Sequence, residues 1–173
     1  VFCVKFKYTF LSALFQLFTN TGCIIFVYLS LLKTIFMNAT LKNTLAIIAG
    51  LIIGSIVNMG IIMISSSVIP PPNGADTTTM EGLKEALHLF EPKPFLFPFL
   101  AHALGTLVGA IVASKIAATH KKTIAIVIGC FFLLGGIINV FLLEGPLWFN
   151  GVDVVFAYIP MALLGYQFSN SKK

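Results

Sequence analysis

Long apolar runs separated by short polar segments dominate the pattern of residues along this chain. Four runs, at residues 45–69, 95–115, 123–143 and 152–168, are of the length that crosses a bilayer as a helix, since roughly twenty apolar residues suffice. The last run is the shortest and contains Pro160. The pattern predicts an all-α membrane protein built as a four-helix transmembrane bundle.

A fifth apolar segment, residues 1–36, mixes Thr, Asn and Gln into its middle. It is either an extra spanning helix over residues 8–32 or a segment that precedes a true start at Met37, as a mis-called start or a cleaved leader. We therefore divide the chain into this amino-terminal segment and a four-span membrane domain at residues 37–173.

The polar stretch between the first two runs predicts a short amphipathic helix at residues 79–90. Thr78 and Glu81 have the spacing of a capping box, and Pro92 ends the helix. The apolar positions fall on one face: Met80, Leu83, Leu87 and Phe90. Such a helix is expected to lie on the outer membrane surface.

Composition supports a membrane protein and excludes several other classes. Hydrophobic residues make up 58% of the chain and charged residues 10%, which is too apolar for a soluble domain. The net charge of +5 comes entirely from lysine, so arginine clamps on phosphate are absent. Three cysteines show no CxxC spacing. The implied partner is the lipid bilayer and not nucleic acid.

Lysines gather on one side of the four predicted spans. They are Lys33, Lys42, Lys115, Lys121, Lys122, Lys172 and Lys173. The acidic residues fall on the other side or at its boundary: Asp76, Glu81, Glu85, Glu91, Glu144 and Asp153. Because cytoplasmic loops carry an excess of lysine, both ends of the four-span core are expected in the cytoplasm.

The two halves of the core resemble each other. Residues 42–50, KNTLAIIAG, are similar to residues 121–129, KKTIAIVIG; an asparagine follows in each span (Asn58, Asn139), and NGAD and NGVD follow the spans. Short apolar segments also recur by chance in a chain as hydrophobic as this one. The shared order favours two parallel hairpin repeats related by an axis along the membrane normal.

Small residues spaced four apart predict where the helices pack closely, because residues at this spacing share one helical face. The glycines expected at these contacts are Gly50, Gly54, Gly105, Gly109, Gly129 and Gly136.

Polar side chains within the outer halves of the spans predict a pocket that opens outward. An unpartnered polar group is costly in hydrocarbon, so these side chains should point into the bundle. The alternative is that they hydrogen-bond one another and only fix helix register. The pocket candidates are Asn58, His102, Thr106, Asn139, Asp153, His88 and Trp148.

Motifs for metal or covalent chemistry are missing from the sequence. There is no HxxxH or HExxH, and no nucleophile motif, so we expect no metal and no cofactor. A membrane enzyme or a metal or haem protein would have to use His102, with His88 or Asp153 as a second ligand, and ranks third among the alternatives.

The chain resembles small bacterial integral membrane proteins of about four spans in four segments: GSIVNMGIIM, PPPNGAD, HLFEPKPFLFPFLAHALGTLVGA and WFNGVDVV. The resemblance covers the chain from Met37 onward. It implies a bacterial inner membrane, but it implies no activity and transfers no functional residue.

Two functions from different classes follow from these observations. The first is binding, or help in translocating, a small molecule through the outward-facing polar pocket. The second is a structural or accessory subunit whose glycine faces pack against a partner membrane protein or a second copy of the chain. A cavity lined by Asn58, His102 and Asn139 would favour the first.

Overall fold

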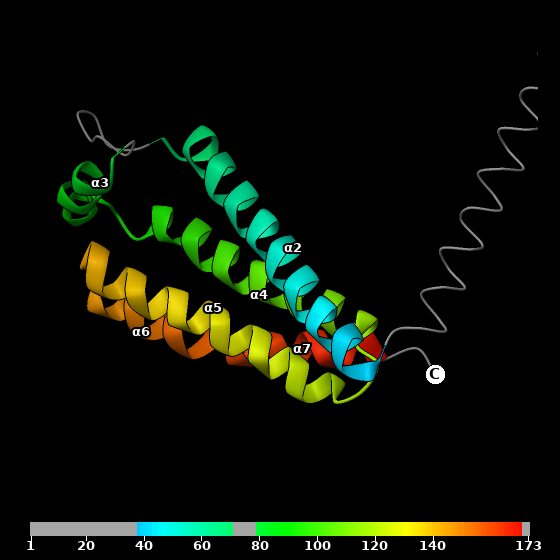
Figure 1. Ribbon diagram of the computed structural model, residues 1–173. Helices are drawn as coiled ribbons and strands as arrows, with labels where there is room; N and C mark the ends of the chain where they lie inside the picture. Colours follow the sequence, from blue (N-terminus) through cyan, green and yellow to red (C-terminus); the bar gives the residue numbers. More distant parts are fainter. Residues whose placement is uncertain (1–37, 71–78, 171–173) are drawn as a thin grey trace, which may run out of the picture. The chain divides into compact units, whose positions relative to one another are not determined.

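The computed structural model describes residues 38–70 and 79–170, and the predictions for residues 1–36, Met37 and Thr78 lie outside them. The described part is helical, with no strand (Figure 1). Its elements are α2 Ala39–Val68, α3 Met80–Ala86, η1 Leu87–Leu89, η2 Lys93–Phe95, α4 Leu96–Ile116, α5 Lys121–Leu143, α6 Leu147–Phe156 and α7 Ile159–Asn170.

Within the described residues, four helical segments are long and apolar enough to cross a membrane: Ala39–Ser65, Lys93–Ile116, Lys121–Leu143 and Leu147–Asn170. They pack against one another, which confirms the all-α four-helix architecture. The first begins six residues before the predicted span, because the polar stretch from Ala39 to Thr44 is already helical.

The fourth span differs most from the prediction. It begins at Leu147, five residues before the predicted run, and it consists of two helices, α6 and α7, separated at Ala157 and Tyr158. Pro160 explains the break, since a proline inside a helix clashes with the carbonyl four residues earlier, here that of Phe156. In the first turn of α7 the same proline is well tolerated.

Helix α4 lies at the centre and packs against α2, α5 and α7. Against α2, a Cβ added at Gly50 would lie 2.7 Å from the carbonyl oxygen of Gly109, and one at Gly54 would lie 2.7 Å from that of Gly105. The two backbones therefore touch along this seam, as the four-residue spacing predicts.

The remaining packing glycines lie at other helix contacts. A Cβ at Gly129 would lie 2.8 Å from that of Ala162 on α7, and one at Gly136 would overlap the side chain of Tyr158. A Cβ added at Gly165, which the sequence analysis did not select, would lie 2.7 Å from the carbonyl oxygen of Leu107. All six selected glycines thus face a neighbouring helix of the same bundle.

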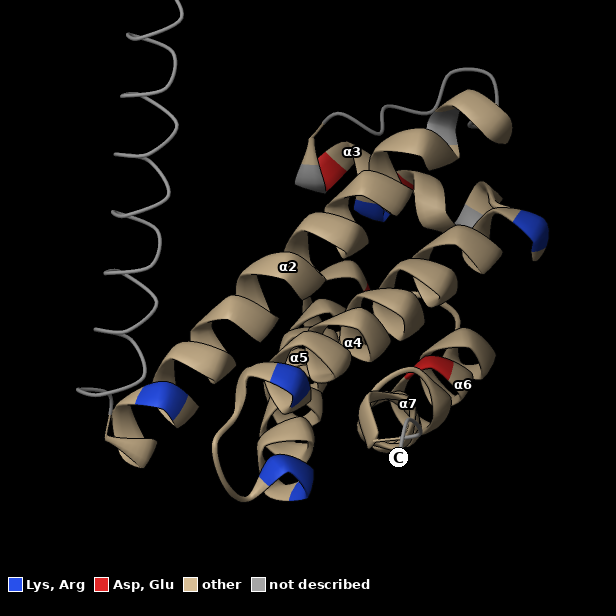
Figure 2. Ribbon diagram, turned by 90° about the vertical axis from the view of Figure 1, so that its right-hand side faces the viewer, with Lys and Arg blue, Asp and Glu red and all other residues tan. Residues whose placement is uncertain are grey.

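One end of the bundle, called the lysine end, carries Lys42, Lys115, Lys121 and Lys122 (Figure 2). Asn43 ties α2 to the α4–α5 turn here. Its Oδ1 accepts hydrogen bonds from the backbone N–H of Ala118 at 2.9 Å and of Thr119 at 3.2 Å. Its Nδ2 donates to Oγ1 of Thr119 at 2.8 Å.

The opposite end, called the α3 end, is where α2 diverges from α5 (Figure 1). Helix α3 is capped by Thr79, whose side chain accepts from the N–H of Gly82. It is shorter than predicted, because its last turn tightens into η1. Lys84 pairs with Glu144 at 2.6 Å, and not with a nearby acid of its own segment, and so links α3 to the α5–α6 loop.

Candidate functional site

A cavity of about 700 Å³ occupies the α3 end of the bundle. Its lining comes mainly from α2, α4, α5 and α6, and residues of α3 and η1 also line it. Most of the lining is apolar. The polar lining residues are Ser55, Asn58, Ser65, His102, Asn139, Asn150 and Asp153. Four of the seven pocket candidates therefore line one cavity.

Asp153 lines this cavity from α6, six residues after that helix begins at Leu147, and is 3% exposed. Nδ1 of His102 is 2.9 Å and 3.0 Å from its two carboxylate oxygens. The hydroxyl of Tyr158 donates to Oδ2 of Asp153 at 2.7 Å and lies 3.0 Å from the same Nδ1. The three side chains form one buried network across α4, α6 and the α6–α7 junction.

The hydrogen bonds of this network indicate which ring nitrogen of His102 carries the proton. Nδ1 of His102 faces two acceptor oxygens, so it carries the hydrogen, and Nε2 is the ring nitrogen left for the cavity. A carboxylate within a membrane span is costly unless it is paired, and both carboxylate oxygens of Asp153 have a donor. The network satisfies Asp153 without using Nε2.

Sequence analysis missed Tyr158, which is 1% exposed and fills the space left by Gly136. A signal was available. A tyrosine hydroxyl in the middle of an apolar span needs a partner, and Asp153 precedes it by five residues. Ser55 and Asn150 were missed as well, and the side chain of Asn150 donates to the carbonyl oxygen of Gly145 at 3.0 Å.

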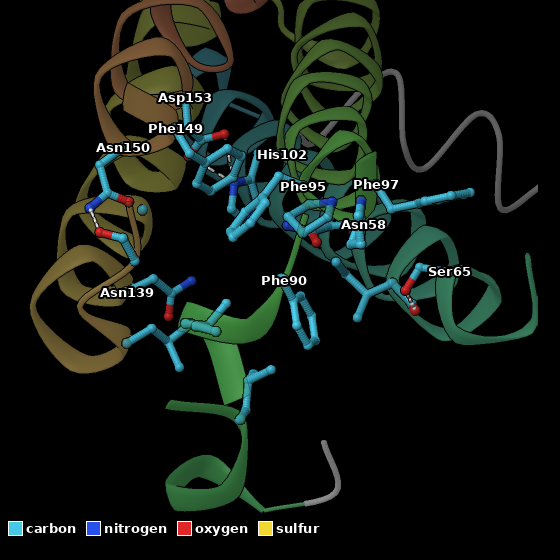
Figure 3. A pocket seen from close by; sticks show the side chains of 18 of the residues that line it. Asn58, Ser65, Phe90, Phe95, Phe97, His102, Asn139, Phe149, Asn150 and Asp153 are labelled. Carbon is cyan, nitrogen blue, oxygen red and sulfur yellow. Dashed lines mark hydrogen bonds and ion pairs between the residues drawn. The ribbon is translucent and has the colours of Figure 1, made fainter. Parts of the chain in front are cut away.

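Asn58 on α2 and Asn139 on α5 approach the cavity from different helices (Figure 3). Within the described part of the chain, neither side-chain amide makes a hydrogen bond, nor does Nε2 of His102. Each amide offers a carbonyl acceptor and an NH₂ donor. Three polar groups with spare hydrogen-bonding capacity thus face a common space between apolar walls.

Aromatic rings pack together at the α3 end of the cavity. Phe95 is 4% exposed, and its ring centroid lies 4.9 Å from that of Phe149, 5.6 Å from that of Trp148 and 6.2 Å from that of Phe90. Trp148 does not line the cavity. It is 52% exposed and packs on the outer side of this cluster.

Two further candidates fall outside the cavity or the described side chains. Thr106 lies one turn beyond His102 and is fully buried, but it lines neither this cavity nor the second one described below. Its Oγ1 has no hydrogen-bond partner among the described residues. The side chain of His88 is outside the described part of the structure. No group of three metal-ligating side chains occurs among the described residues.

Comparison with known proteins gave no match to a family model, to a curated protein or to a solved structure. The resemblance to small bacterial four-span proteins is therefore supported only at the level of four membrane-spanning helices. What the site does has to be argued from its own residues.

Proposed function

We propose that the protein binds a small molecule in the cavity at the α3 end and holds it by hydrogen bonds to Asn58, Asn139 and His102. One observation carries this proposal: the two amides and Nε2 of His102 line the same cavity and have no partner in the described protein. An amide without a partner in a membrane-spanning helix costs on the order of 1–3 kcal/mol. A bound molecule or ordered water would supply the missing partners.

The size and composition of the cavity support this proposal. A volume of about 700 Å³ is within the range of small-molecule sites, which combine mainly apolar walls with a few polar groups. The rings of Phe90, Phe95 and Phe149 line the cavity at this end, so they would shield part of a bound molecule from bulk water.

Binding is better supported than conduction through the bundle. The cavity lining on α2 and α4 ends at Ser55 and His102, and closer to the lysine end Gly50 and Gly109 hold these helices in backbone contact. Translocation would require this seam to open. The accessory-subunit alternative has less support, because the selected glycines pack within the bundle.

The lysine end is proposed to face the cytoplasm of a bacterial inner membrane, so that the cavity opens to the outside. Lys84 and Lys93, at the α3 end, are accompanied there by Glu81, Glu85, Glu91 and Glu144. The excess of positive charge therefore lies at the lysine end.

Native mass spectrometry of the purified protein tests the proposal. The wild type should retain an added mass that Asn58→Leu and Asn139→Leu lose, because leucine keeps the branched shape of the side chain but not its hydrogen bonds. Asn170→Leu is the matched control, since Asn170 is exposed on α7 and lines no described cavity. Stable variants that retain the same mass as the wild type would contradict the proposal.

A further inference from the structure

A second cavity, of about 340 Å³, adjoins the first. Five residues line both: Ser55, Asn58, His102, Gly136 and Asn139. The other residues of the second cavity lie on α2, on α5 and at Tyr158: Leu51, Phe131, Phe132, Gly135 and Tyr158. The unpartnered amides of Asn58 and Asn139 therefore stand at the junction of two cavities.

The second cavity opens between α2 and α5 toward the lipid. Phe131 is 56% exposed, and a Cβ added at Gly135 would meet no atom within 4 Å. These residues come 10 and 14 positions after the start of α5 at Lys121, about 15 and 21 Å along a helix. The opening is therefore at the depth of the hydrocarbon core, where α2 diverges from α5 (Figure 1).

The polar groups at the junction favour an uncharged headgroup. Among the described residues no lysine lines either cavity, and the chain contains no arginine, so an anionic headgroup has no counter-ion there. Both carboxylate oxygens of Asp153 are already hydrogen-bonded to His102 or Tyr158, and its side chain is only 4% exposed, so a cationic group in the cavity would make little direct contact with it. Hydroxyl groups match the two amides and can donate to Nε2 of His102, and a carbonyl group can accept from the NH₂ groups of the amides.

The walls of the first cavity suit an apolar chain. Beyond the polar junction, toward the α3 end, it is lined by Met59, Ile62, Leu83, Leu87, Val140 and Leu143. A site with polar groups at a deep junction, long apolar walls and a side opening to lipid fits a molecule with one small polar end and one apolar chain.

We infer that the ligand is an uncharged single-chain amphiphile, which reaches the site from the bilayer through the opening between α2 and α5. Its headgroup donates a hydroxyl to Nε2 of His102 and bonds through hydroxyl or carbonyl groups to Asn58 and Asn139, and its chain lies along the apolar walls. The inference rests on the proposed binding function and adds the class of ligand and its route.

Photolabelling in phosphatidylcholine nanodiscs tests the inference. The probe is a monoacylglycerol with a diazirine in its acyl chain and an alkyne for detection. The wild type should be labelled on the cavity-lining residues of α2 and α5, and excess monoacylglycerol should abolish the labelling. Glycerol, which has the headgroup alone, and the anion of a fatty acid of the same length should compete at least about tenfold less well, because neither combines an apolar chain with an uncharged headgroup.

Gly135→Leu should reduce the labelling roughly tenfold, because the leucine side chain would project into the side opening, where an added Cβ meets no atom within 4 Å. Gly60→Leu is the matched control. Gly60 is also a helical glycine with open space around its Cβ, but it lines neither cavity, so labelling should be unchanged. Melting temperatures show whether each variant remains folded, and the competition experiment on the wild type does not depend on any variant.

The possible failures separate the two proposals. Labelling that is lost in Asn58→Leu and Asn139→Leu but unchanged in Gly135→Leu would overturn the lateral route and leave the binding function standing. Equal competition by glycerol would overturn the amphiphile class. Labelling that is scattered over the lipid-facing side of α2 and insensitive to all three variants would overturn the inference, and a wild type that also retains no mass in the native experiment would overturn the binding function.

Discussion

Nδ1 of His102 on α4 lies 2.9 Å and 3.0 Å from the two carboxylate oxygens of Asp153 on α6. Only 15% of the histidine side chain and 4% of the aspartate side chain are exposed. This contact fixes α4 against the last span and leaves Nε2 of His102 to the cavity. The same contact therefore contributes to the stability of the bundle and orients His102 in the site.

Removing one partner of this pair should destabilise the protein more than removing both. His102→Leu leaves the buried carboxylate of Asp153 with Tyr158 as its donor, at a cost of about 3 kcal/mol in the free energy of unfolding. His102→Leu combined with Asp153→Leu removes the charge and should recover part of that loss, whereas His102→Gln keeps a donor and should be milder than His102→Leu. Unfolding in detergent measures all three, and strictly additive effects of the two leucine substitutions would contradict the pairing.

Two adjacent glycines on α5 should respond differently to alanine. A Cβ at Gly136 would overlap the ring and hydroxyl of Tyr158, so Gly136→Ala should displace Tyr158 from Asp153 and cost about 1–3 kcal/mol. Gly135→Ala should be neutral or slightly stabilising, since its Cβ meets nothing within 4 Å. Melting temperatures of the two variants provide the comparison, and equal values would show that Tyr158 is not held as described.

The α2–α4 seam should not tolerate a large side chain. Gly109→Leu would force apart two backbones in contact at Gly50, so we expect loss of the folded bundle or a large fall in melting temperature. Gly60→Leu serves as the control, because Gly60 lies on α2, as Gly50 does, but has open space around its Cβ. Size-exclusion profiles and thermal unfolding in detergent measure both, and a Gly109→Leu protein as stable as the control would contradict the seam.

Thr106→Val should stabilise the protein by about 1 kcal/mol. Thr106 is fully buried, and its Oγ1 has no partner among the described residues, so the hydroxyl contributes a desolvation cost that a methyl group removes. The melting temperature should rise. A lower melting temperature would show that the hydroxyl has a partner, such as an internal water.

Reporter fusions test the orientation of the bundle. A fusion after Lys122 should report the cytoplasm and a fusion at Gly145 the outside, because the lysine end carries the excess positive charge. The two positions lie at opposite ends of α5, so each is the control for the other. Reversed signals would place the cavity on the cytoplasmic side.

Hydropathy was sufficient to predict the four-helix architecture. A membrane span requires a continuous apolar stretch of fixed length, and this is a property of one segment that can be read without its neighbours. The cost of a polar group in hydrocarbon likewise selected Asn58, His102 and Asn139, all of which line the cavity.

Only the tertiary structure decided which side chains meet. The sequence did not reveal that Tyr158 joins His102 and Asp153, because this depends on the break before Pro160 and on the space left by Gly136. The direction in which each helix turns its side chains places Thr106 away from the cavity and Trp148 on the exposed side of the aromatic cluster, outside the cavity lining. Hydropathy along one segment contains no information about helix rotation or about the divergence of α2 from α5, and both are set by packing between helices.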